Sequence, residues 1–203
     1  MTDHIPIEEK YPMIRVVSHI VGLFDATGVN HGRRVALMSM SIGMMLGMDE
    51  NRLELLEVAA LLHDVGKAGV PEYIRIKPGK LVRGEEIIMR MHPAWGLEIL
   101  EMMNSKMDQT VRDDVVAHHE NWDGSGYPSR LKGSEIPYGA RIIRIADTYD
   151  AMTHSRGIRS PFSHSEAVDV MIRDQGDGNL FDPEIFRFFL TMMKGKNYPP
   201  SLG

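Results

Sequence analysis

The 203-residue chain contains no cysteine, so disulfide bonds, iron–sulfur clusters and thiolate zinc sites are excluded. Any bound metal ion must therefore be held by imidazole nitrogen and carboxylate oxygen. The chain also lacks an apolar run of membrane-spanning length. Its first ten residues lack the basic segment and apolar core of a signal peptide. We therefore expect a cytoplasmic protein with no membrane partner.

Basic residues are not in excess either. The formal net charge is -5, so the chain as a whole does not attract nucleic acid polymers, and we expect none as a partner. A phosphate-ester substrate would need local positive charge, which bound divalent metal ions or a few placed basic side chains can supply. The chain shows no internal repeat or low-complexity linker, and its length is short for two full domains.

The hydrophobic pattern is helical nearly throughout, and no strand pattern persists beyond a few residues. Asn30, Asp49 and Asp108 are predicted helix N-caps, Gly47 is a predicted C-terminal stop, and Pro183 suits a first helical position. We expect helices over residues 11–24, 30–47, 49–62, 85–91, 94–103, 108–119 and 138–152, and from residues 163 and 183 onward. The prediction is one all-α domain over residues 1–203, with an N-terminal helical segment at 1–24.

The segment 53–62 is apolar on almost every side of the predicted helix, which indicates burial at the centre of the domain. It ends in His63 and Asp64, so residues that can bind metal follow a well-packed element. Other histidines and acids also lie at the ends of separate predicted helices, which is how a helical bundle builds a metal centre in its core. They are His31, His92, His118, His119 and Asp147.

A lone histidine is more often a surface residue or a hydrogen-bonded core residue than a ligand, and we assign His4, His19, His154 and His164 to that class. The remaining histidines differ from that class, because most of them lie within longer motifs that follow one another in a known order. Those motifs are His63–Lys67, Met91–Gly96, His118–Pro128, Leu131–Ile142, Ala146–Thr153 and Phe181–Pro183. Together they closely resemble the HD-GYP family of the HD-domain metal-dependent phosphohydrolases, over about residues 25–190.

The resemblance implies an HD-type helical bundle with a dinuclear metal site in its core. It also implies hydrolysis of cyclic di-GMP to linear pGpG, with further cleavage to GMP left open. The implied ligands are imidazoles and carboxylates, which suit iron, manganese, nickel or zinc better than calcium or copper(I). The family often uses iron or manganese, so we expect two ions of either metal, with zinc or nickel as alternatives. The implied ligand set is His31, His63, Asp64, His92, His118, His119 and Asp147.

Asp64 has two carboxylate oxygens and can bridge the two ions, whereas an imidazole offers one free lone pair. Two adjacent divalent ions lower the pKa of a water between them, so that hydroxide forms near neutral pH and attacks phosphorus. Some family members hold a third metal with a glutamate four residues before the first histidine. This chain has Thr27 there, which predicts two ions.

The resemblance also implies phosphate contacts from Lys67, Arg156 and Arg159, since the family places basic residues there. The alternative for Lys67 is a solvated surface lysine. The alternative for the two arginines is a cation that interacts with a helix end, and this alternative is stronger for Arg159 than for Arg156. The family's usual Arg-Pro-Tyr-Arg segment reads Arg-Gly-Ile-Arg here, so the groove edge is expected to be looser.

The loop formed by Gly126, Tyr127 and Pro128 is expected to line the substrate groove and is a candidate contact for a diguanylate cyclase (GGDEF) partner, or another regulatory domain, in trans. Gly126 permits unusual backbone angles, and Pro128 stiffens the chain. The compatible alternative is a turn whose tyrosine packs on the domain. Two other functions remain open, namely turnover of another cyclic dinucleotide or phosphoester, and a binding or partner-recruiting module without catalysis.

Overall fold

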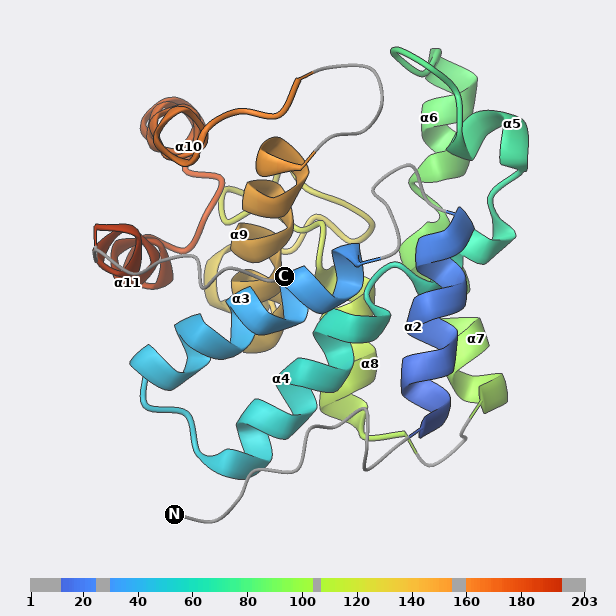
Figure 1. The fold of residues 1–203 in the computed structure, drawn as a ribbon, viewed down its shortest axis with the longest axis horizontal. Coiled ribbons are helices and arrows are strands. Elements are labelled where there is room, and N and C mark those ends of the chain that lie inside the picture. Colours follow the sequence, from blue (N-terminus) through green and yellow to red (C-terminus); the bar gives the residue numbers. More distant parts are fainter. Residues whose placement is uncertain (1–11, 25–29, 104–106, 155–159, 195–203) are drawn as a thin grey trace.

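The computed structural model describes residues 12–24, 30–103, 107–154 and 160–194. Within these ranges it is built of helices and contains no β-strand, so the predicted all-α class is confirmed (Figure 1). None of the helices in these ranges is long and apolar enough to cross a membrane.

Within the described residues, eight longer helices form the body of the fold. They are α2 (Pro12–Phe24), α3 (His31–Met45), α4 (Glu50–Leu62), α7 (His92–Met103), α8 (Gln109–Ala117), α9 (Tyr138–Thr153), α10 (His164–Gly178) and α11 (Pro183–Met193). Four short elements connect them: η1 (Val65–Gly69), α5 (Glu72–Arg75), α6 (Arg83–Met89) and η2 (Gly133–Glu135). The expected helices are present, with boundaries shifted by a few residues. The helix expected from residue 94 begins at His92, and the helix expected to reach residue 119 ends at Ala117.

Local capping residues start several of these helices where the sequence predicts them. The side chain of Asp49 accepts a backbone N–H of the first turn of α4 at 2.9 Å, and that of Asp108 accepts one of α8 at 2.8 Å. Gly47 follows α3 with φ 72°, the left-handed conformation that glycine adopts after a helix end. Asn30 occupies the N-cap position of α3 but makes no side-chain capping bond, so that part of the prediction is wrong.

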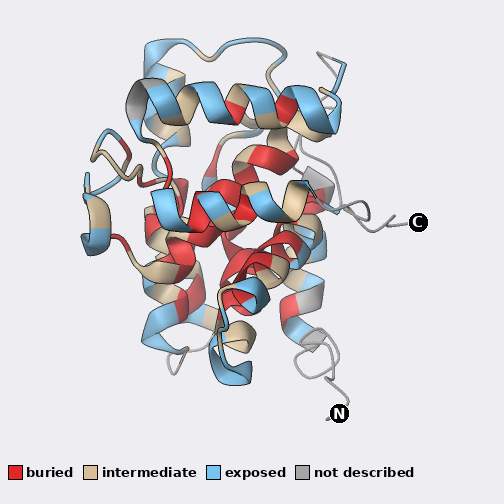
Figure 2. Cartoon of the chain, turned by 90° about the vertical axis from the view of Figure 1, so that its left-hand side faces the viewer, coloured by how far each residue is buried: buried red, intermediate tan, exposed pale blue. Residues whose placement is uncertain are grey.

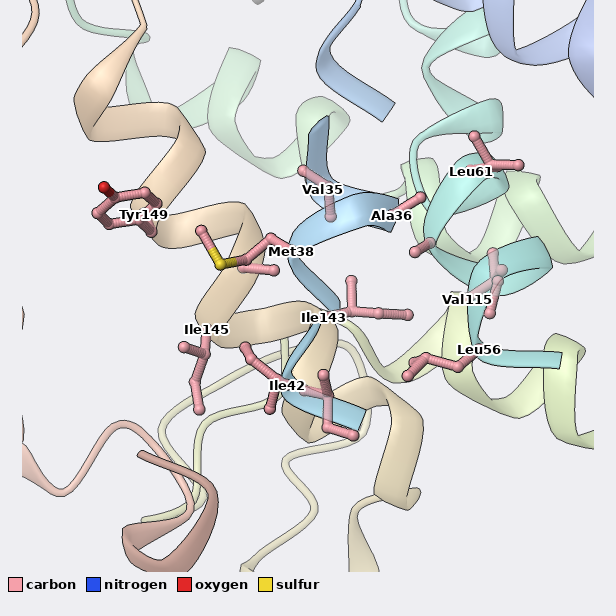
Figure 3. Packing of buried hydrophobic residues seen from close by; sticks show 14 of the residues in the cluster. Val35, Ala36, Met38, Ile42, Leu56, Leu61, Val115, Ile143, Ile145 and Tyr149 are labelled. Carbon is pink, nitrogen blue, oxygen red and sulfur yellow. The ribbon is translucent and has the colours of Figure 1, made fainter. Parts of the chain in front are cut away.

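Helix α4 lies at the centre of the core, as its apolar sequence predicts. It packs against α3, α8 and α9. Figure 2 shows the buried residues concentrated where the helices face one another. In Figure 3, Ile42 of α3, Leu56 of α4 and Ile143 of α9 pack together, each at most 1% exposed. Burying each such side chain contributes about 1.5–3 kcal/mol, so the helix that leads into His63 is firmly held in the core.

The N-terminus of α9 is capped by a residue from another helix. Pro137, at the N-cap position, makes no side-chain capping bond. Asp114 of α8 instead accepts the backbone N–H of Ala140 at 2.8 Å and is 1% exposed. A Cβ at Gly139 would lie 2.0 Å from Oδ2 of Asp114, so a larger residue there would have to displace the capping carboxylate. This contact joins α8 to the first turn of α9.

Asp114 is expected to make stability depend on pH. Burial raises the pKa of Asp114 to about 7, although the hydrogen bond from the backbone N–H of Ala140 acts to lower it. Between about pH 4 and pH 7 the folded state then binds more protons at this carboxyl than the unfolded state, so the free energy of unfolding falls as pH rises through that window.

We expect Asp114→Asn to lose this pH dependence. Relative to the wild type, the variant should gain up to about 3 kcal/mol of stability between pH 5 and pH 8, because about two pKa units of the shift are lost in that interval and each is worth about 1.4 kcal/mol. Urea unfolding of both proteins at the two pH values measures this difference. Other titrating groups are the same in both proteins, so their contributions cancel. Parallel pH dependences of the two proteins would show that Asp114 ionises normally in the folded state.

Candidate metal centre

Five helices deliver the side chains that the sequence predicts as ligands. His31 is the first residue of α3 and His92 the first of α7, while His63 and Asp64 directly follow α4. The remaining three come from the end of α8 and the middle of α9, namely His118, His119 and Asp147. The structure thus brings all seven together, although they span more than half of the chain.

The seven side chains form two groups, within each of which the candidate donor atoms lie within 4.8 Å of one another. We call the first the His31 position; it consists of His31, His63 and Asp147. We call the second the His92 position; it consists of Asp64, His92, His118 and His119.

Asp64 lies between the two positions. Its Oδ2 is 3.2 Å from Nε2 of His63 and 3.4 Å from Nε2 of His31. Its Oδ1 is 3.3 Å from Nε2 of His92. The two oxygens of one carboxylate therefore face different groups of imidazoles, which is the arrangement that a bridging ligand requires.

The backbone sets which nitrogen of three histidines faces the centre. Nδ1 of His63, of His92 and of His118 lies 2.7, 2.7 and 2.6 Å from the carbonyl oxygen three residues earlier. A carbonyl only accepts hydrogen bonds, so Nδ1 carries the proton and donates it. Nε2 is then left with a lone pair directed at the centre, the form in which imidazole binds a metal.

Unpaired nitrogen atoms show that these residues fit cations. Nε2 of His31 and Nε2 of His63 are buried and have no hydrogen-bond partner. Nε2 of His92 and Nε2 of His118 are 3.2 Å apart. Because each ring carries its proton on Nδ1, both Nε2 atoms are acceptors and cannot hydrogen-bond to each other. Two nitrogens on one ion, with bonds of about 2.1 Å, lie about 3.0–3.4 Å apart. A divalent cation would therefore satisfy atoms that otherwise bear a desolvation penalty.

The electrostatics favour the metal-binding forms of several donors. Burial lowers the pKa of His118 and His119 well below the ordinary value, and neighbouring imidazoles lower it further. Burial alone would raise the pKa of Asp64, but His63 and Lys67 outweigh it and hold that pKa well below its usual range. The donors are thus neutral imidazoles and ionised carboxylate, as cation binding requires.

Protons compete with cations at the His31 position. Burial lowers the pKa of His31, but the neighbouring carboxylates of Asp147 and Asp150 outweigh it, and the pKa is raised well above its ordinary value. The pKa of His63 is likewise raised, because Asp64 outweighs burial. Cation binding there is therefore expected to release protons and to strengthen as pH rises.

Lys67 lies at the centre, where its predicted contact with a phosphate requires it to be. Its Nζ is 2.7 Å from Oδ2 of Asp64, and its side chain is 15% exposed. A solvated surface lysine does not describe this position, while contact with a phosphate stays a prediction. Arg156, Arg159 and Thr27 fall outside the described residues.

The loop of Gly126, Tyr127 and Pro128 packs against the centre. The ring of Tyr127 lies 4.8 Å from that of His119, centroid to centroid, and the guanidinium of Arg90 lies 5.1 Å from the Tyr127 ring centroid. Buried Glu120 supports the loop by accepting backbone N–H bonds of residues 129 and 131 at 2.7 and 3.1 Å. The packed tyrosine is thus observed, and the lining of a substrate groove stays a prediction.

Gly126 is required for a different reason from the one expected. Its φ is not in the left-handed region. A Cβ at this position would lie 2.3 Å from the backbone nitrogen of Asn121 and 2.6 Å from the carbonyl oxygen of His119. The expectation of unusual backbone angles is therefore corrected, because close approach of two backbone segments excludes any larger residue.

Sequence reasoning missed three residues around the centre. Asp150 accepts a hydrogen bond from Nδ1 of His31, and Arg34 donates to Asp150. Arg144 donates to the side chain of Asn121 at 2.9 Å, which links α9 to the long loop. Asp150 and Arg34 each follow a predicted ligand by three residues, so helical spacing could have identified both. His154 and His164 lie outside both groups, as expected, and His4 is outside the described residues.

Comparisons with known proteins agree with this geometry. The family described as HD domain matches residues 15–185. The chain is 36% identical over 160 residues to the 3'3'-cGAMP-specific phosphodiesterase 2 of Vibrio cholerae, covering 79% of this chain and 30% of that protein. It is 35% identical over 184 residues to the cyclic di-GMP phosphodiesterase of Thermotoga maritima, covering 91% of this chain and 50% of that protein.

The fold also resembles a solved structure. The HDG"Y"P protein of Bdellovibrio bacteriovorus matches with a TM-score of 0.65 and 23% identity, over 81% of this chain and 52% of that chain. This chain spans only 30% and 50% of the lengths of the two curated relatives above. From the extent of the match and the arrangement of the helices, the chain belongs to the HD domain family, and its predicted likeness to the HD-GYP proteins is confirmed.

Proposed function

We propose that this chain is a metal-dependent phosphodiesterase that hydrolyses cyclic di-GMP to linear pGpG, with GMP as a possible second product left open. The observation that carries the proposal is the position of Asp64, whose two oxygens face two separate groups of ligand-type side chains. Relatives named as phosphodiesterases of cyclic dinucleotides support the substrate class.

Two bound divalent cations would supply a water of lowered pKa as nucleophile and would stabilise the charge that develops on the phosphate oxygens. In this chain, the seven His and Asp side chains would hold them. We propose two ions per chain, iron or manganese, with zinc or nickel as alternatives. Asp64 would keep the two positions at a fixed separation, and the imidazoles of His118 and His119 would stay neutral, the form that binds a metal.

Lys67 is proposed to contact the scissile phosphate. Its ammonium group already lies beside Asp64, where a phosphate oxygen bound at the centre would meet it. Arg156 and Arg159 are proposed as further phosphate contacts on the strength of the resemblance. The loop of Gly126, Tyr127 and Pro128 is proposed to line the substrate groove, because Tyr127 packs on His119. The same loop is the proposed contact for a GGDEF domain in trans.

A second candidate substrate is 3'3'-cGAMP, because a Vibrio cholerae relative that is 36% identical is named as specific for it. The phosphodiester chemistry is the same for both molecules, since the cations and Lys67 act on phosphate and not on the base. Discrimination between the two substrates must therefore come from contacts with one base.

An anaerobic assay of the metal-loaded protein tests the proposal. Protein loaded separately with iron, manganese and zinc is given cyclic di-GMP or 3'3'-cGAMP, and the products are identified by chromatography with the metal content counted. We expect two ions per chain, turnover of cyclic di-GMP to pGpG, and none in chelated protein. Faster turnover of 3'3'-cGAMP would correct the substrate. Tight binding with no turnover under any metal would indicate a binding module, and three firmly bound ions would refute the metal count.

A further inference from the structure

Among the candidate ligands, four imidazoles have described Nδ1 partners, and these partners are of two kinds. His63, His92 and His118 each donate from Nδ1 to a backbone carbonyl three residues earlier. His31 instead donates from Nδ1 to Oδ2 of Asp150 at 2.7 Å, a side chain 119 residues away. A carboxylate is a stronger acceptor than a carbonyl, because the hydrogen bond is charge-assisted.

Asp150 cannot serve as a ligand in this arrangement, because both of its oxygens are engaged elsewhere. It is 4% exposed and follows Asp147 by three residues on α9, so both acids lie on one helix face. Arg34 donates from Nε to Oδ1 at 2.6 Å and from Nη2 to Oδ2 at 2.9 Å. Asp147 faces Nε2 of His31 at 3.3 Å, while Asp150 faces the opposite nitrogen of the same ring.

The three residues form one unit that joins two helices. Arg34 follows His31 by three residues on α3, so both side chains reach across to α9 at the same level. The planar guanidinium holds the carboxylate by two parallel bonds, which leaves it a single orientation. Arg34 also balances the charge of Asp150, whose side chain is buried.

We propose that Asp150, held by Arg34, is a positioning residue that strengthens cation binding at the His31 position and leaves the His92 position unaffected. The inference rests on the proposed metal function. A carboxylate behind a ligating imidazole fixes the ring and increases its basicity, and loss of such a partner weakens metal binding about 10–100-fold. The supports of the two positions therefore differ. One has a buried ion pair behind His31 and a backbone carbonyl behind His63, and the other has backbone carbonyls behind His92 and His118.

The test is equilibrium binding of Mn²⁺ to the whole chain, measured as bound manganese at graded free concentrations. We expect two ions in the wild type. Asp150→Asn should weaken one dissociation constant about 10–100-fold and leave the other unchanged. At intermediate Mn²⁺ concentrations, electron paramagnetic resonance should show the isolated-ion spectrum in the variant and a coupled pair in the wild type.

Two further variants keep the test decisive. Arg34→Lys retains the charge but loses the two-bond contact, so it should weaken the same constant by a smaller factor, and it serves if Asp150→Asn fails to fold. Asp169→Asn makes the same chemical change at an exposed acid of α10 and should match the wild type. Unchanged binding in both Asp150→Asn and Arg34→Lys, or equal weakening of both ions, would overturn the inference. A wild type that binds no manganese, iron or zinc would instead refute the metal centre itself.

Discussion

Replacing Asp64 by alanine is expected to reduce turnover of the cyclic dinucleotide by on the order of 10³-fold or more, while the helical content stays unchanged. The carboxylate faces both cation positions, with its oxygens 3.2 Å from Nε2 of His63 and 3.3 Å from Nε2 of His92. Its loss would remove a donor from each position and leave the separation of the two ions unset, so catalysis that depends on a water between them should fail.

The measurement is turnover of cyclic di-GMP by metal-loaded protein, together with the metal content and the circular dichroism spectrum. Asp64→Asn tests whether charge or shape matters, because it keeps the volume and removes the charge; we expect a similar loss. His63→Ala should also abolish turnover. Asp169→Ala, at an exposed position on α10, provides a control that should retain full activity. Retained hydrolysis in Asp64→Ala or His63→Ala would contradict the mechanism.

The second large effect is expected from one methyl group at Gly66. A Cβ at this position would lie 1.8 Å from the carbonyl oxygen of His92 and 2.4 Å from the backbone nitrogen of Gly96. Both obstacles are backbone atoms of α7, which packs closely against η1. They cannot move without shifting the helix that begins at His92, so Gly66→Ala should destabilise the fold by about 3 kcal/mol or more.

The same variant should weaken metal binding at the His92 position, since His92 would be displaced along with α7. Urea unfolding measures the first effect and manganese binding the second. Gly84→Ala is the matched control, because a Cβ at Gly84, in the first turn of α6, meets nothing within 4 Å. Wild-type stability in Gly66→Ala would show that η1 and α7 can separate without cost.

The helices and the candidate ligands were predictable because their signals are local. Apolar residues at helical spacing identified α4 as central, and Asp49 and Asp108 marked helix starts that the structure confirms. The ligands were found through motifs in a known order, not through spacing alone. The prediction for Gly126 failed because it considered only local backbone angles. The φ of Gly126 is not in the left-handed region, and glycine is needed there because a second backbone segment approaches closely.

By itself, the sequence determined the helical class, the burial of the segment that ends at His63, and the identity of the side chains that can bind metal, since each depends on residue type and short-range order. Only the tertiary structure decided what supports those side chains. Asp114 caps a helix that begins 24 residues later, and Asp150 meets a histidine 119 residues away. Such pairings follow from how helices pack, and the free energy of packing is shared among many apolar contacts that no short stretch of sequence contains.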